Sequence, residues 1–162
     1  ALMRRRMPDF RVDVVGLWND FPRYRESVES LIRTLAAEDM VVLRGLVSRE
    51  VRDRLYQQAG CYLTLSAHEG FCAPIIEALA EGLPVVSGDE GSLPETLGQA
   101  GIVVPGSDPV YAAEAVYLML TDPELRTSFE PYAQARVRDT AATAIAPRVV
   151  EFVDTNLAAR GG

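Results

Sequence analysis

One stretch of the chain decides the fold: Cys61–Gly88 reads CYLTLSAHEGFCAPIIEALAEGLPVVSG. Its two ends, CYLTLS and LPVVSG, are short apolar runs typical of strands buried on both faces of a parallel sheet. The segment PIIEALAEG between them has a helical pattern and ends at Gly82, a residue suited to the left-handed position after a helix. A strand, a helix and a second strand in succession indicate a right-handed parallel crossover.

The same alternation extends to both sides of this stretch. Further β-rich runs are Phe10–Gly16, Met40–Gly45 and Gly101–Pro105. Helical patterns separate them. The first expected helix has its apolar face at Val28, Leu31, Ile32 and Leu35. The second has Ser48 as its N-cap and apolar residues at Val51, Leu55 and Ala59, and LPETLG predicts a further short helix. We therefore expect an α/β fold, a Rossmann-like parallel sheet with helices on both faces.

After Pro105 the strand pattern stops and helical patterns follow. DPVYAAEAVYLMLTD predicts one helix, and PELRTSFEPYAQARVRDT predicts a second that is interrupted near Pro131. A last amphipathic stretch runs from about Thr143 to Leu157. We expect residues 1–162 to form a single domain.

Composition excludes several classes of function. The chain of 162 residues has a net charge of -7, which argues against nucleic acid as a partner. Its 16 basic residues are all arginine, so a Walker-type phosphate loop and a lysine Schiff base are absent from this sequence. No apolar run approaches the ~20 residues of a membrane span, and the first ten residues do not form a signal peptide. We expect a cytoplasmic protein.

The loop after CYLTLS carries the candidate chemistry. Ligands of parallel sheets bind beyond the carboxyl ends of the strands. There, Gly70 allows close approach of the backbone, Pro74 suits a first helical turn, and free amides at the helix start suit a phosphate. Glu69 and Glu77 would flank these amides and accept hydrogen bonds from sugar hydroxyls. Acidic residues near a helix start are also favoured by the helix dipole without any ligand.

Other residues of this region have alternative interpretations. His68 is a candidate general base, although local hydrogen bonding is the more frequent role of one loop histidine. Cys72 at a helix start is a candidate for a lowered pKa. Cys61 is expected in the core. Arg23 and Arg25 after the first strand are candidates for a phosphate contact, with a solvated helix face as the simpler account.

Two further site types were weighed. Two cysteines and one histidine cannot form a Cys/His zinc site without carboxylates. A glycosidase carboxylate pair usually comes from different elements of a closed cleft. Two glutamates on one loop and helix fit hydrogen bonding to hydroxyl groups better.

The segment SAHEGFCAPIIEALAEGLPVVSGDEGSLPETLGQAGIVV resembles the donor-site signature of retaining GT-B glycosyltransferases, the glycosyl transferases group 1 family. The family pattern is Glu-Gly-Phe-x-x-Pro-x-x-Glu-Ala, then a Gly-x-Pro-Val-Val strand, then a glycine-containing loop that ends in Pro-Glu. The residues that fit are Glu69, Gly70, Phe71, Pro74, Glu77, Ala78, Gly82, Pro84, Val85, Val86, Gly91, Pro94 and Glu95. The resemblance spans about Val12 to Phe152.

The resemblance implies a nucleotide-sugar as partner and assigns roles to individual residues. Glu69 would contact the donor sugar and serve as the catalytic residue, with the amides of Gly70, Phe71 and Cys72 near sugar and phosphate. Glu77 would bind the ribose hydroxyls. Leu46 and Val47, after the second strand, would lie beside the nucleobase. The resemblance implies that no metal and no cofactor are needed, which agrees with the absence of an Asp-x-Asp motif in this sequence.

The sequence departs from the family in two respects. The first strand-helix unit, with the Arg and Lys that neutralise the diphosphate in the family, is not found, and neither is the N-terminal acceptor domain. We therefore expect a donor-binding half that is inactive alone and has a surface open to self-association. The alternative is a non-catalytic nucleotide-sugar-binding or scaffolding module.

Overall fold

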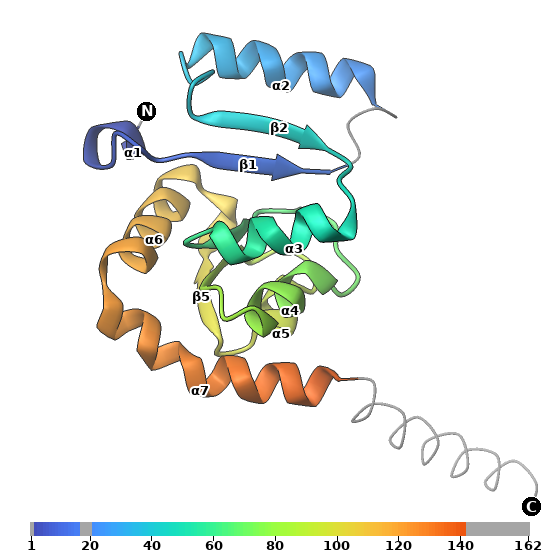
Figure 1. The fold of residues 1–162 in the computed structure, drawn as a ribbon, viewed down its shortest axis with the longest axis vertical. Helices are drawn as coiled ribbons and strands as arrows, with labels where there is room; N and C mark the ends of the chain where they lie inside the picture. The colour runs from blue at the N-terminus through green and yellow to red at the C-terminus, as the bar shows by residue number, and fades with distance from the viewer. Residues whose placement is uncertain (1, 17–20, 142–162) are drawn as a thin grey trace, which may run out of the picture. The chain divides into compact units, whose positions relative to one another are not determined.

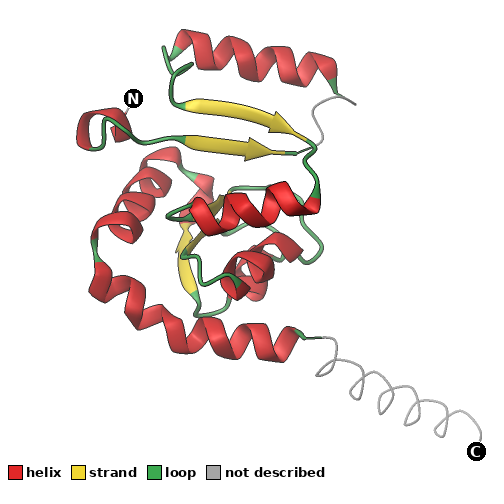
Figure 2. Ribbon diagram, in the orientation of Figure 1, coloured by secondary structure: helices red, strands yellow, loops and turns green. Residues whose placement is uncertain are grey.

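The computed structural model describes residues 2–16 and 21–141 and divides the chain into two compact units, residues 1–59 and 60–162. All strands are parallel to their partners, and helices and strands alternate along the chain (Figures 1 and 2), which confirms the expected α/β class. The predicted stretch from Thr143 to Leu157 lies outside the described residues. The single-domain assignment stays a prediction.

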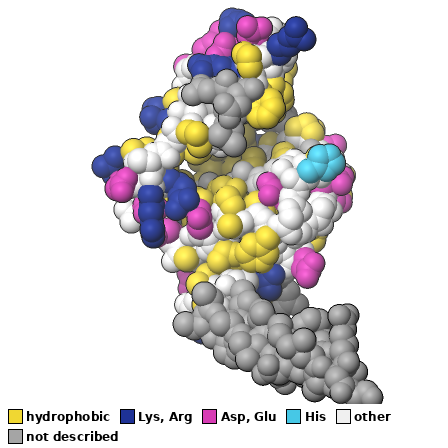
Figure 3. All heavy atoms as spheres, turned by 90° about the vertical axis from the view of Figure 1, so that its right-hand side faces the viewer, with side chains coloured by type: hydrophobic (Ala, Val, Ile, Leu, Met, Phe, Trp, Pro, Cys, Tyr) yellow, Lys and Arg dark blue, Asp and Glu magenta, His cyan; other side chains and the backbone are white. Residues whose placement is uncertain are grey.

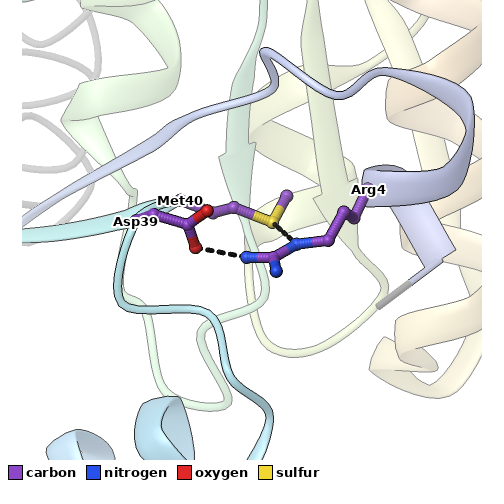
Figure 4. A network of polar contacts seen from close by, with 3 residues as sticks. All are labelled: Arg4, Asp39 and Met40. Carbon is purple, nitrogen blue, oxygen red and sulfur yellow. Dashed lines mark hydrogen bonds and ion pairs between the residues drawn. The ribbon is translucent and has the colours of Figure 1, made fainter.

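The first unit contains a pair of parallel strands and three helices. Its elements are α1 (Leu2–Arg6), β1 (Val12–Val15), α2 (Pro22–Thr34), β2 (Val41–Gly45) and α3 (Arg49–Gln58). Val12 of β1 is opposite Val41 of β2. The sequence patterns did not predict α1. Figure 4 shows how this helix is attached: the guanidinium of Arg4 donates from Nε to the Met40 sulfur at 3.1 Å and pairs with Asp39.

Ser48 and the apolar helix faces of this unit had been predicted from the sequence. The Ser48 hydroxyl caps α3 by accepting from the Val51 amide at 3.4 Å, which confirms the predicted N-cap. The predicted apolar faces are only partly covered: Val28, Ile32, Val51 and Leu55 are half-buried, and neither α2 nor α3 has a fully buried residue. Leu31 is 56% exposed. Helical periodicity locates an apolar face, but it does not supply the neighbour that covers it.

The second unit is built on a three-stranded parallel sheet in the order β3-β4-β5. Its elements are β3 (Tyr62–Thr64), α4 (Ala73–Ala80), β4 (Val85–Gly88), α5 (Leu93–Leu97), β5 (Gly101–Val104), a 3₁₀ turn (Pro105–Ser107), α6 (Pro109–Thr121) and α7 (Pro123–Thr140). All four residues of the central strand β4 are buried, and α4, α5 and α6 pack against it. Both faces of this strand are therefore covered.

Gly82 follows the C-cap of α4, as predicted, and forms a Schellman motif. Gly82 has φ +74°, its amide donates to Leu79 O at 3.1 Å, and the Leu83 amide donates to Ala78 O at 2.9 Å. Glycine adopts this left-handed conformation without the steric cost of a Cβ. The turn directs the chain from α4 into β4.

Within the described residues, hydrogen bonds join the strands as a parallel pair and a parallel triplet. Two sequence-based expectations require correction. Strands β1 and β3 are only partly buried, unlike β4. Helix α7 continues through Pro131 instead of being interrupted there. It loses one backbone hydrogen bond at the proline but packs against α4 and α6.

Candidate functional site

The candidate site is the loop that joins β3 to α4. Strand β3 ends at Thr64 and α4 begins at Ala73, with Pro74 in its first turn as predicted. Because β3, β4 and β5 are parallel, their carboxyl ends share one edge of the sheet, and the loops after β3 and β4 both leave from it. These two loops contact each other through specific hydrogen bonds, described next.

The loop before α4 is tied to the segment after β4. The Ser92 hydroxyl donates to the carbonyl of Glu69 at 3.0 Å, and the Thr96 hydroxyl donates to the carbonyl of Phe71 at 2.6 Å. Gly91 has φ +57°, and a Cβ added there would lie 3.2 Å from the Glu69 carbonyl oxygen. A larger residue at Gly91 would therefore meet both backbone strain and the Glu69 backbone.

Cys72, the last loop residue, has a left-handed backbone. Its φ is 52° and its ψ is 61°, it is the N-cap residue of α4, and its carbonyl accepts from the Ile75 amide at 2.9 Å. This conformation costs about 1–2 kcal/mol for a residue with a Cβ. Such strain persists where the surroundings impose it, and it is concentrated at ligand sites and active sites. The sequence did not reveal this feature, because cysteine has no preference for positive φ.

Helix α5 is in turn anchored by α7. The Arg136 guanidinium donates from Nε to Thr96 O at 2.7 Å and from Nη2 to Glu95 O at 2.5 Å. These are carbonyls of the last turn of α5, where cationic donors are favourable. The side chain of Thr96 is almost fully buried. The loop before α4 is thus connected to α7 through one short helix.

The structure brings five of the predicted site residues together on one loop and helix. Glu69 is half-buried, Gly70 and Phe71 are exposed, Cys72 is buried, and Glu77 is half-buried on α4. An added Cβ at Gly70 would meet no atom within 4 Å, so the surrounding protein itself leaves room for a side chain there. The roles assigned to these residues stay predictions.

Leu46 and Val47, the two residues predicted beside a nucleobase, follow β2 in the first unit. Leu46 is 68% exposed and Val47 is half-buried. Their assignment to the nucleobase also stays a prediction.

The two thiols are not activated. Burial, followed by the negative charge of Glu69, raises the pKa of the Cys72 thiol, so the lowered pKa expected at a helix start is wrong. The side chains of Thr64 and Tyr62 lower the pKa of that thiol, but by less than burial and charge raise it. His68 is exposed (cyan in Figure 3). Burial also raises the pKa of Cys61 to about 12. Both thiols are therefore protonated at neutral pH.

Other polar groups fit ordinary surface chemistry. Arg25 pairs with Glu29 at 2.8 Å one turn along α2, in agreement with a solvated helix face. Among the described residues, no group of three or more His, Cys, Asp or Glu side chains is placed to hold a metal ion. None of the described helices is long and apolar enough to cross a bilayer.

Sequence reasoning did not assign a role to Ser92, Thr96 or Arg136. The segment GSLPET after β4 was part of the recognised motif, and a serine before a short helix was a usable signal for Ser92. Arg136 had no local signal, because it contacts residues 40 and 41 positions away.

Comparison with known proteins relates this chain to one family. The family described as glycosyl transferases group 1 matches residues 1–136. The chain is 34% identical over 131 residues to a GDP-mannose-dependent α-(1-6)-phosphatidylinositol monomannoside mannosyltransferase of Mycolicibacterium smegmatis, covering 75% of this chain and 33% of that protein. It is 32% identical over 89 residues to the GtfA subunit of a UDP-N-acetylglucosamine–peptide N-acetylglucosaminyltransferase of Streptococcus parasanguinis, covering 55% of this chain and 16% of that protein. The chain thus spans a third or less of the length of these relatives.

Solved structures agree on the fold. HepE of Anabaena, in complex with UDP and glucose, superposes with a TM-score of 0.81 at 20% identity, over 94% of this chain and 42% of that chain. The C-terminal domain of a glycosyl transferase group 1 protein from Francisella tularensis superposes with a TM-score of 0.71 at 19% identity, over 86% of this chain and 73% of that chain. These neighbours have the GT-B glycosyltransferase fold. The chain described here belongs to the glycosyl transferases group 1 family, and the fold of its two units matches one half of a GT-B glycosyltransferase.

Proposed function

We propose that this chain is the donor-binding part of a retaining, metal-independent glycosyltransferase that uses a nucleotide-diphosphate sugar. The observation that carries the proposal is the strained loop Glu69–Cys72, held by hydrogen bonds at the carboxyl edge of a parallel sheet. Loops at this edge are where ligands of α/β sheets bind. The GDP-mannose and UDP-N-acetylglucosamine dependence printed for two relatives supports a nucleotide-sugar as the ligand class.

The groups on the loop match the chemistry of such a donor. Peptide amides at the start of α4 suit a diphosphate, and carboxylates accept hydrogen bonds from hydroxyl groups. We assign Glu69 to the sugar hydroxyls beside the reacting carbon, the amides of Gly70, Phe71 and Cys72 to sugar and phosphate, and Glu77 to the ribose hydroxyls. In this assignment no metal ion or cofactor is used.

Transfer to a glycan, lipid or small-molecule acceptor requires groups that we assign to other parts of a longer enzyme. The sequence contains no lysine, whereas a diphosphate leaving group is best stabilised by cations and oriented amides together. We propose that an N-terminal acceptor domain supplies the rest of the catalytic site and that this chain alone does not catalyse transfer. Apolar side chains are exposed on the surface (yellow in Figure 3). Those on α2 include Tyr24 and Leu31, and Leu35 directly after the helix is exposed as well. Self-association of the isolated chain would cover them.

Calorimetric titration of the 162-residue chain with UDP, GDP and ADP, and with their sugar conjugates, tests the binding proposal. We expect one nucleotide to bind and to shift the amide signals of residues 69–77. Glu77→Gln should weaken that binding about 10- to 100-fold, because it removes a charged acceptor for hydroxyl donors. The matched control is Glu130→Gln, which neutralises an exposed glutamate on α7 and should bind like the unmodified chain.

The outcome separates the proposal from its alternatives. Absence of binding by all three nucleotides and their sugars would refute the donor-binding role. Equal loss of affinity in both variants would refute the role of Glu77. Binding without turnover, also after an acceptor domain of the same family is added, would favour a non-catalytic nucleotide-sugar-binding module.

A further inference from the structure

Two hydroxyl groups, one before helix α5 and one within it, donate hydrogen bonds to carbonyls of the loop before α4. Ser92 precedes α5 and Thr96 lies within it, and each donates to one loop carbonyl, Glu69 O at 3.0 Å and Phe71 O at 2.6 Å. The loop peptides are trans. In a trans peptide the carbonyl and the N–H of the same unit point in opposite directions.

The amide directions follow from this geometry. The N–H on the other end of the Glu69 peptide belongs to Gly70, and the N–H on the other end of the Phe71 peptide belongs to Cys72. Both carbonyls face α5, so both N–H groups point away from it. Neither amide makes a hydrogen bond with residues 2–16 or 21–141. Two donors on the same side of one short loop are an arrangement that suits an anion with several oxygens.

Thr96 is the better anchored of the two hydroxyl residues. It is 1% exposed, so an unpaired Thr96 hydroxyl or Phe71 carbonyl would be costly. Its own backbone carbonyl is fixed by the Arg136 guanidinium at 2.7 Å. The Thr96 hydroxyl also borders Cys72, whose left-handed backbone needs support from its surroundings.

We propose that Thr96, assisted by Ser92, is a positioning residue for the diphosphate of the donor. Its hydroxyl fixes the Phe71–Cys72 peptide so that the amides of Gly70 and Cys72 face the ligand, and Arg136 holds α5 in place behind it. This role rests on the donor-binding function proposed above. It predicts that loss of the Thr96 hydroxyl acts on the diphosphate part of the ligand and not on the nucleoside part.

The test compares variants that remove a hydroxyl donor with a variant that keeps it. Thr96→Val keeps the shape and removes the donor, whereas Thr96→Ser keeps the donor. The matched control is Thr121→Val in α6, which removes another threonine hydroxyl that donates to a backbone carbonyl, Tyr117 O at 2.7 Å, at an exposed position. Ser92→Ala and Thr96→Ser allow the test to proceed even where Thr96→Val does not fold.

Two readouts are measured on the 162-residue chain. In the free chain, Thr96→Val should change the amide shifts of Gly70 and Cys72 and speed hydrogen exchange of the α4 start, with little change elsewhere in the unit. In titrations, Thr96→Val should weaken pyrophosphate and the preferred nucleoside diphosphate about three- to tenfold and leave the free nucleoside unaffected. Ser92→Ala should have a smaller effect in the same direction, and Thr96→Ser should bind nearly as well as the unmodified chain.

The possible failures differ from one another. A chain that binds the nucleoside diphosphate equally well with and without the Thr96 hydroxyl would overturn the positioning role and leave the donor-binding function standing. Equal losses for nucleoside and nucleoside diphosphate, or equal losses in Thr96→Ser and Thr96→Val, would show a general structural role and would also overturn it. Absence of binding by the unmodified chain would overturn the function and this proposal together.

Discussion

The two units of this chain differ in how they use their apolar residues. In residues 60–162 the central strand β4 is entirely buried, and Leu93, Leu97 and Met119 have no exposed surface. In residues 1–59 the buried hydrophobic residues among the described positions are Met3, Ala37 and Met40, and α2 and α3 bury no residue.

This difference explains which unit can support a loop with a strained backbone. A strained loop with oriented amides needs supporting side chains that are themselves fixed by packing. Thr96 and Cys72 are fixed in this way in the second unit. The first unit has the same alternation of strands and helices, but its helices have a less complete core to pack against. The same supersecondary pattern can therefore either support a strained loop or leave an apolar face open.

The largest expected effect comes from removing core volume in the second unit. Leu97→Ala should lower the free energy of unfolding by about 2–5 kcal/mol, because it leaves a cavity at a side chain with no exposure. Leu31→Ala in α2, at a position 56% exposed, should change it by less than about 0.5 kcal/mol. Urea unfolding followed by far-ultraviolet circular dichroism measures both. A cost for Leu31→Ala as large as that of Leu97→Ala would mean that the α2 face is covered in solution.

The next effect is a loss of stability at alkaline pH that originates in the second unit. Burial raises the pKa of Cys61 from 9.0 to about 12. Between these values the folded chain keeps the thiol proton and the unfolded chain releases it, so rising pH favours unfolding by about 1.4 kcal/mol per pH unit. Cys61→Ala should flatten the decline in unfolding free energy between pH 9 and pH 11. An unchanged slope in the variant would contradict the assignment to Cys61.

The first unit offers the opposite pH dependence. A hydrogen bond from the Ser48 hydroxyl lowers the pKa of the exposed carboxyl of Glu50. The ionised carboxyl therefore adds a small amount to the free energy of unfolding. This contribution is present above the ordinary carboxyl pKa of 4.5 and is lost as the pH falls through the lowered pKa. Ser48→Ala removes this hydrogen bond and is the control variant when the free energy of unfolding is compared at acid pH.

A last comparison concerns the residue that follows the C-cap of one helix in each unit. After α2 this residue is Ala36, with φ 47°, and after α4 it is Gly82, with φ 74°. Ala36→Gly should raise the unfolding free energy by about 1 kcal/mol and Gly82→Ala should lower it by about 1 kcal/mol, because a left-handed backbone disfavours a Cβ. Thermal unfolding of the two single variants measures the pair. Effects of the same sign would show that fraying, not backbone strain, controls one of the two helix ends.

Local features were predictable from the sequence because neighbouring residues specify them. The five strands, the Ser48 cap, the Gly82 helix end and the short helix α5 all depend on patterns within a few residues. The predicted interruption at Pro131 failed for the complementary reason. A proline weakens one turn locally, and the packing of α7 against α4 and α6 outweighs that loss.

The sequence by itself determined the α/β class, the family and the loop on which the candidate site lies, because periodicity and a motif of about 40 residues are written in local order. Tertiary structure decided the left-handed Cys72, the raised pKa of its thiol and the hydrogen bonds of Ser92, Thr96 and Arg136. The hydrogen bonds of Ser92, Thr96 and Arg136 join residues between 23 and 41 positions apart in the chain. Burial, charge and hydrogen-bond partners at such separations arise only when the chain has folded.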